Sequence, residues 1–138
     1  MKHENLKVRT KAFALRIINL VDKLPNNLSC QVIGKQLLRC GTSVGANYRA
    51  SCRARSQADF ISKIGIVIEE ADEALFWMEL LVESGMIKEV LLQSLINEAN
   101  ELVAIFIASG KTAKENNKNY IQCYFLYTIA TSLRKKFP

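Results

Sequence analysis

The segment SQADFISKIGIVIEEADEALFWMELL, residues 56–81, carries the most regular apolar repeat in the sequence. Its apolar side chains recur at alternating steps of four and three residues: Phe60, Ile64, Val67, Ala71, Ala74, Met78 and Leu81. This spacing follows the 3.6-residue turn of an α-helix and predicts one continuous buried stripe. Ser56, with Asp59 three residues later, predicts the start of this helix, and Gly85 predicts its end.

Similar stripes on either side predict three more helices. The first covers about residues 7–24 and ends at Pro25, and the second runs from about residue 28 to about residue 55. The last carries Leu92, Leu95, Ala99, Leu102 and Phe106, and we expect it to close at Gly110. Short connections between four amphipathic helices indicate an all-α, antiparallel up-down four-helix bundle with a short C-terminal extension.

We place the bundle domain at residues 1–117 and the extension at residues 118–138. Residues 111–119 read as a polar linker, and Tyr120–Leu133 is an aromatic-rich apolar run followed by three basic residues. At about 14 residues the run is shorter than the roughly 20 needed to span a bilayer. Packing on the bundle or on a neighbouring subunit is the first expectation. A membrane-interface helix and a disordered extension remain alternatives, and contact with a membrane is not the favoured one.

Charge divides the chain into two parts. Residues 1–63 carry twelve lysines and arginines against three carboxylates, whereas residues 64–110 carry nine carboxylates against one lysine. Such a division suits binding of nucleic acid, or pairing of basic and acidic faces within and between subunits. The four cysteines form no CxxC pair and the N-terminus lacks a signal-peptide pattern, so we expect reduced thiols and a cytoplasmic protein.

The strongest basic feature is QLLRCGTSVGANYRASCRARS, residues 36–56. Steps of three and four place several of its cations, with Lys35, on one helical stripe. We predict six phosphate contacts: Lys35, Arg39, Arg49, Arg53, Arg55 and Lys63. Gly41 and Gly45 each cost a helix about 1 kcal/mol relative to alanine, which indicates close approach by another helix or a ligand.

Two polar residues of the same segment are expected to be structural. Ser43, like the glycines, keeps the helix narrow. Asn47 falls on the inward side, where a buried amide must find a partner. We therefore expect Asn47 to bond across to a backbone group or polar side chain, as a clamp rather than a ligand contact.

No catalytic or cofactor-binding pattern is present. The single histidine, His3, rules out Glu-x-x-His metal motifs and leaves nucleophiles without a histidine base. The phosphate-loop motif GxxxxGK[ST] and the dinucleotide-binding motif GxGxxG are also missing from the sequence. We therefore expect no enzyme activity, cofactor or metal.

The helix of residues 56–83 has more apolar surface than one core needs. A second stripe lies beside the first, and Trp77 extends it: Ile61, Ile68, Leu75 and Val82. Since a large exposed apolar face is unfavourable in water, we predict that these five residues form an oligomer interface.

Three segments together resemble a known family: QLLRCGTSVGANYRA, SQADFISKIGIVIEEADEALFWMELL and LINEANELVAIFIASGKTAK. They are similar to the four-helix bundle proteins encoded in intervening sequences of bacterial 23S ribosomal RNA genes, across residues 6–117. Related bundles include the accessory variability protein of diversity-generating retroelements. Many relatives have a glutamate shortly after the asparagine, where this chain reads Tyr48 to Ser51.

The resemblance implies a homopentamer without enzymatic activity, whose basic surface contacts RNA or a reverse transcriptase. The leading functional hypothesis is an oligomeric bundle that binds RNA or DNA through the basic surface. The alternative is a protein-interaction scaffold or accessory subunit that does not bind nucleic acid directly.

Overall fold

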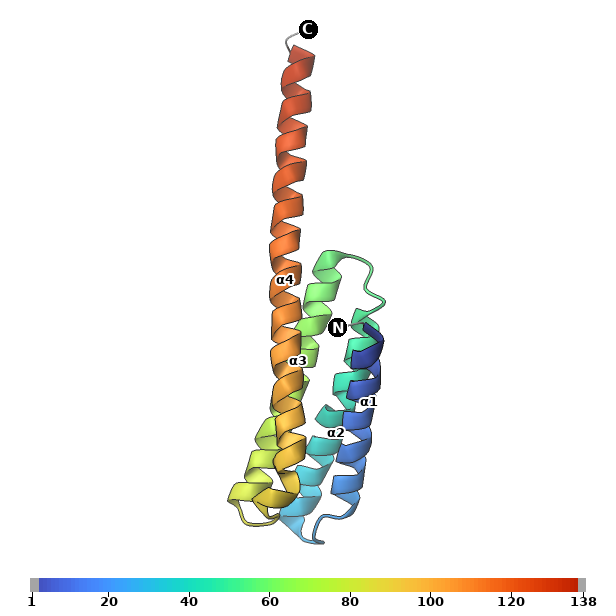
Figure 1. The fold of residues 1–138 in the computed structure, drawn as a ribbon, viewed down its shortest axis with the longest axis vertical. Helices are drawn as coiled ribbons and strands as arrows, with labels where there is room; N and C mark the ends of the chain where they lie inside the picture. The colour runs from blue at the N-terminus through green and yellow to red at the C-terminus, as the bar shows by residue number, and fades with distance from the viewer. Residues whose placement is uncertain (1–2, 137–138) are drawn as a thin grey trace.

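The computed structural model describes the backbone of residues 3–136 and side chains of residues 6–119, 121, 122, 125 and 126. The backbone forms four helices: α1 (His3–Asp22), α2 (Leu28–Ser51), α3 (Gln57–Glu83) and α4 (Glu89–Lys136). Each helix runs antiparallel to the one before it, and the α2–α3 connection lies at the opposite end from the other two (Figure 1). Consecutive helices pack side by side, and of the helix pairs in contact α1 and α4 touch least. The predicted all-α up-down bundle is confirmed.

The ends of α3 follow the signals read from the sequence, whereas α2, expected to run to about residue 55, ends at Ser51. The Ser56 hydroxyl accepts a hydrogen bond from the Asp59 amide at 3.1 Å, and the Asp59 carboxylate accepts one from the Arg55 amide. At the other end of α3, Gly85 has a φ of 75°. The amides of Gly85 and Met86 bond back to the carbonyls of Val82 and Leu81, which completes a glycine C-cap.

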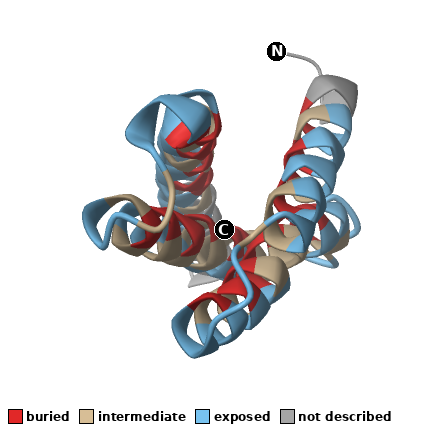
Figure 2. Cartoon of the chain, turned by 90° about the horizontal axis from the view of Figure 1, so that it is seen from below, coloured by how far each residue is buried: buried red, intermediate tan, exposed pale blue. Residues whose placement is uncertain are grey.

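Buried faces of the helices turn towards one another along the bundle (Figure 2). On α3, the predicted stripe from Ile64 to Leu81 is buried and Phe60 is half-buried. Between α1 and α4 the contact is partly polar, because Arg9 binds Glu98 through two nitrogens at 3.0 and 2.9 Å and also reaches Glu101. Ion pairs therefore link the most weakly packed of the contacting helix pairs.

Helix α4 departs from the sequence prediction. It continues through Gly110 and the segment expected to be a linker, so both the helix end and the linker were wrong. Gly110 is buried, and a Cβ there would lie 3.4 Å from Ile64 Cγ2. The glycine therefore serves close packing against α3, and Gly85 is the one residue of positive φ in the described backbone.

Beyond the bundle, α4 projects far past the other helices (Figure 1). Its last buried side chain is Ala113, and the predicted domain boundary after residue 117 falls inside the unbroken helix. Ile121, Phe125 and Leu126 are 58%, 65% and 59% exposed. These three side chains do not pack on the chain's own bundle, and packing on a neighbouring subunit, the other half of that expectation, stays a prediction. The remaining apolar side chains of the run from residue 120 to residue 133 lie outside the described ones.

By length and composition, residues Glu89–Asn119 of α4 could cross a membrane. The inward side of the same segment, including Leu92, Leu102 and Phe106, lies in the bundle core. A core helix meets the same length and composition criteria, so this hydropathy alone does not indicate a span.

Candidate nucleic-acid interface

Helices α1 and α2 approach closely because α2 presents glycines to α1. A Cβ at Gly41 would lie 2.8 Å from Ile17 Cγ1 and 2.9 Å from Ile17 Cγ2. One at Gly45 would lie 3.4 Å from backbone atoms of Thr10. The predicted close approach is confirmed at Gly41, where the partner is a helix of the same chain, while at Gly45 an added Cβ would make an ordinary van der Waals contact with that helix.

A groove of about 460 Å³ runs along the outer side of this contact. Small residues of α2, including Thr42, Gly45 and Ala46, line it, together with Val8 and Ala14 of α1. Four exposed cations also line it: Lys7, Lys11, Arg49 and Arg53. We call this groove with its four cations the basic groove. Among the side chains that the structure describes, none of these four forms an ion pair.

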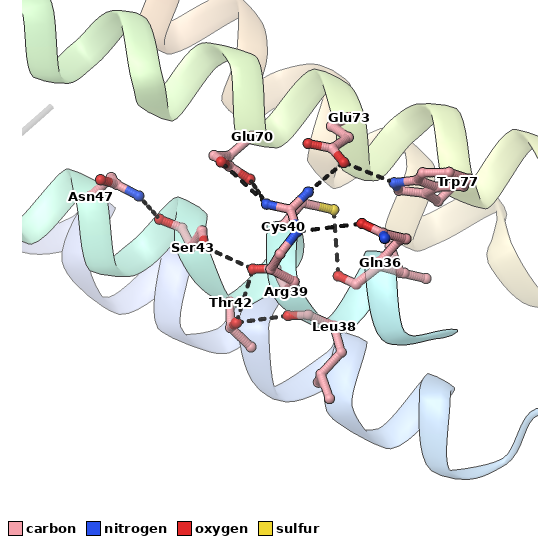
Figure 3. Close-up of polar contacts among 11 residues, drawn as sticks. Gln36, Leu38, Arg39, Cys40, Thr42, Ser43, Asn47, Glu70, Glu73 and Trp77 are labelled. Carbon is pink, nitrogen blue, oxygen red and sulfur yellow. Dashed lines mark hydrogen bonds and ion pairs between the residues drawn. The ribbon is translucent and has the colours of Figure 1, made fainter. Parts of the chain in front are cut away.

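Arg39 belongs to the same helix but turns towards α3 (Figure 3). Its guanidinium pairs with Glu70 at 3.2 Å and with Glu73, and Glu73 also accepts a hydrogen bond from Trp77 Nε1 at 3.2 Å. The bond from Arg39, followed by that from Trp77, lowers the pKa of Glu73 below its ordinary value. The charge of Arg39 is thus matched within the bundle, so this residue does not join the basic groove as the stripe had suggested.

The other three predicted phosphate contacts lie in different settings. Lys63 pairs with Asp59 one turn earlier at 2.6 Å, which lowers the pKa of that carboxyl. Arg55 is exposed in the α2–α3 connection, near Arg53. Lys35 lines a separate, smaller hollow near the α1–α2 turn. Of the six, the structure brings only Arg49 and Arg53 together in one groove.

The two polar residues expected to be structural bond within their own helix. Ser43 donates to the Arg39 carbonyl at 2.7 Å, and Asn47 Nδ2 donates to the Ser43 carbonyl at 2.9 Å (Figure 3). Asn47 is only half-buried. The predicted bond across to another element is therefore wrong for the amide nitrogen, since a carbonyl one turn back is within easier reach.

The predicted oligomer interface is only partly accessible. Leu75 is 6% exposed and belongs to the core, so it cannot meet a neighbour and that assignment was wrong. Trp77 is half-buried and stacks edge-on against Phe76, with ring centroids 5.0 Å apart. The remaining predicted residues are also half-buried: Ile61, Ile68 and Val82. The exposed large apolar residues of α3 are instead Ile66 and Phe76.

The described side chains offer little for covalent or metal chemistry. Burial raises the pKa of the Cys40 thiol to about 12, so it stays protonated and is a poor nucleophile near neutral pH. Burial likewise raises the pKa of Tyr48. Within the described residues, no group of three or more potential ligands could hold a metal ion.

Lys7 and Lys11 were missed as site residues by sequence reasoning. They were counted only in the charge of the first 63 residues, because they stand four apart on a different predicted helix. The glycines at 41 and 45 were the available signal. Once these glycines face the first helix in an antiparallel pair, Lys7 and Lys11 must lie beside the end of α2 that carries Arg49 and is followed by Arg53.

Comparison with known proteins supports the family resemblance. The chain matches the family model described as 23S rRNA-intervening sequence protein over residues 4–122. A search of curated proteins finds no match. Among solved structures it resembles the 1.70 Å crystal structure of a protein of unknown function from the S23 ribosomal protein family of Bacteroides thetaiotaomicron VPI-5482. The two share 38% identity and a TM-score of 0.74, over 80% of this chain and 99% of that chain. The chain therefore belongs to the family of 23S rRNA-intervening sequence proteins.

Proposed function

We propose that this chain is a non-enzymatic, oligomeric bundle that acts in the cytoplasm and binds structured RNA or an RNA–protein complex through the basic groove. The observation that carries the proposal is the gathering of Lys7, Lys11, Arg49 and Arg53 around one groove with no carboxylate paired to them among the described side chains. A phosphate backbone supplies the missing negative charge and needs no base-specific pocket.

The floor of the groove suits such a ligand. Gly45 and Ala46 are small, so a backbone phosphate can approach the helix while the longer cations close over it from both sides. Arginine in particular binds phosphate oxygens with two nitrogens. Contacts of this kind provide affinity without reading sequence, so binding should weaken steeply with salt.

The test is a filter-binding titration of a synthetic RNA hairpin at about 50 and about 200 mM salt. The variant Arg49→Glu/Arg53→Glu reverses two groove charges and should lose at least about tenfold in affinity at the lower salt. The matched control Lys23→Glu/Lys88→Glu makes the same change in net charge at exposed positions beside the two turns at the far end of the bundle. It should bind nearly as the wild type does.

Absence of binding by the wild type at low salt would reject the proposal. Equal losses in the groove variant and the control would reject the groove as the site, since net charge alone would then explain the effect. Circular dichroism of both variants checks that the helices remain folded.

Oligomerisation is supported by the outer face of α3. Ile66 and Phe76 are exposed there, among carboxylates that form no ion pair with the described side chains: Glu69, Asp72, Glu79 and Glu83. A neighbouring copy that covers this face with a surface other than the basic groove leaves the groove open to RNA, and such a head-to-tail contact can close into a ring such as a pentamer. Light scattering decides this point, because a stable monomer at micromolar concentration contradicts it.

The second candidate function is a protein-interaction scaffold, for example an accessory subunit of a reverse transcriptase. It draws on the ion pairs that already join helices within the chain, Arg39 to Glu70 and Arg9 to Glu98. Basic and acidic helices of different chains could pair in the same way. In that case the RNA titration shows no binding while the assembly persists.

A further inference from the structure

The continuation of α4 arranges three lysines that the sequence had placed in a linker. Because the segment is helical, Lys111, Lys114 and Lys118 stand at steps of three and four and share one face. All three are exposed. Along the helix axis they span about 10 Å at 1.5 Å per residue.

This row borders a concave seam between α3 and α4. The seam has a volume of about 460 Å³, and Ile68, Ile107 and Gly110 form its apolar part. Glu115 is the one acidic residue of its lining. No carboxylate forms an ion pair with the three lysines within the described side chains, so the row has positive charge left to bind an anionic partner.

The row lies at the same end of the bundle as Arg53 and Arg55. Gln57, which begins α3 directly after the α2–α3 connection, donates from Nε2 to the Ala113 carbonyl at 3.2 Å. That bond fixes the start of α3 against the part of α4 that carries Lys114. Arg53 and Arg55, the cations of the α2–α3 connection, therefore lie between the basic groove and the lysine row.

We infer that Lys111, Lys114 and Lys118 form a second phosphate-binding surface for the same nucleic acid, reached from the basic groove across the α2–α3 connection. This inference rests on the proposed function. Duplex carries about one phosphate charge per 1.7 Å of axis, so about 10 Å offers roughly six charges to three lysines. A short stretch of RNA is enough to engage the whole row.

The placement favours a nucleic acid over a lipid surface. The helices follow one another around the bundle, so the α1–α2 groove and the α3–α4 seam lie on opposite sides. A planar bilayer contacts one side at a time, whereas a folded RNA or a flexible strand can follow cations round the end of the bundle.

The test compares the full-length wild type with Lys111→Gln/Lys114→Gln/Lys118→Gln in binding to the same RNA hairpin across a salt series. Affinity falls with salt, and loss of three phosphate contacts should make the slope of log affinity against log salt shallower by about two to three units. Binding at low salt should be about tenfold weaker. The Lys23→Glu/Lys88→Glu variant again serves as the control, since it removes more charge than the triple variant does.

The outcomes separate this inference from the proposed function. If the wild type binds and the groove variant fails, but the triple variant keeps the wild-type slope, the second surface is refuted and the first stands. If the wild type does not bind RNA, both fail. In a parallel sedimentation assay with phosphatidylserine vesicles, loss of vesicle binding in the triple variant without loss of RNA binding would assign the row to lipid and overturn the inference.

Discussion

Towards α1, helix α2 presents Gly41 and Gly45, whereas towards α3 it presents Arg39. The glycine contact brings two backbones together and leaves the long side chains at its edge without carboxylate partners among the described residues. The arginine contact instead matches charge with charge, through Glu70 and Glu73. Two basic parts of this region thus have different settings, one at the proposed ligand surface and the other in a link between helices.

This difference shows why a count of charges overstates a binding surface. The first 63 residues carry twelve cations, yet Arg9, Arg39 and Lys63 are paired within the chain. Exposed ion pairs contribute modestly to stability, but each one lowers the positive potential that a polyanion meets. The cations that matter are those that folding leaves unmatched.

The largest expected effect comes from breaking the glycine contact. Gly41→Ala places a methyl group 2.8 Å from buried Ile17. Overpacking costs about 1–3 kcal/mol, and the better helix propensity of alanine returns up to about 1 kcal/mol. We expect the free energy of unfolding to fall by about 1–2 kcal/mol in urea denaturation.

Gly45→Ala is the matched control for this prediction. Its added methyl group meets Thr10 at 3.4 Å, an ordinary van der Waals contact. The variant should therefore equal the wild type or exceed it by up to about 1 kcal/mol. A Gly41→Ala protein as stable as Gly45→Ala would show that α1 and α2 do not pack this closely.

A smaller effect should separate the two kinds of arginine in RNA binding. Arg53→Ala removes an unmatched groove cation, so the slope of log affinity against log salt should become shallower by about one unit. Arg39→Ala removes a cation already neutralised by α3 carboxylates, so the slope should stay near that of the wild type. Fluorescence anisotropy with a labelled RNA hairpin over a salt series measures both, and equal changes in the two variants would refute the distinction.

The smallest effect is the pH dependence of the arginine contact. The pKa of Glu73 is lowered from an ordinary value of 4.5, first by the bond from Arg39 and then by that from Trp77. When the pKa of a carboxyl is lower in the folded state than in the unfolded state, its ionised form stabilises the fold at pH values above the unfolded-state pKa. That stabilisation is lost as the pH falls through the folded-state pKa. Stability should therefore decline below about pH 4.5.

Glu73→Gln isolates this contribution. The variant cannot titrate at position 73, so its decline in thermal midpoint between pH 5 and pH 3 should be shallower than that of the wild type. The difference should be small because the Arg39 and Glu73 side chains are 49% and 34% exposed. Parallel pH curves for the two proteins would mean that Glu73 is not held by Arg39 in solution.

The sequence by itself determined the helices whose boundaries carry local signals. The apolar stripe of residues 60–81, the Ser56–Asp59 cap and Gly85 each depend on residues a few positions apart, so the start and end of α3 followed directly. Gly41 and Gly45 indicated a close helix contact for the same reason, since their cost in a helix needs a local compensation.

Only the tertiary structure decided which residues of other helices these side chains contact. Gly110 looks like another helix end, but burial against Ile64 makes it a packing residue, and α4 runs on. Leu75 shares a stripe with half-buried residues yet lies in the core, because α3 packs against two helices. The use of each arginine was decided in the same way. Arg39 and Arg53 look alike in the sequence, and only the carboxylates or lysines of a second helix distinguish a paired cation from one that lines the proposed binding groove.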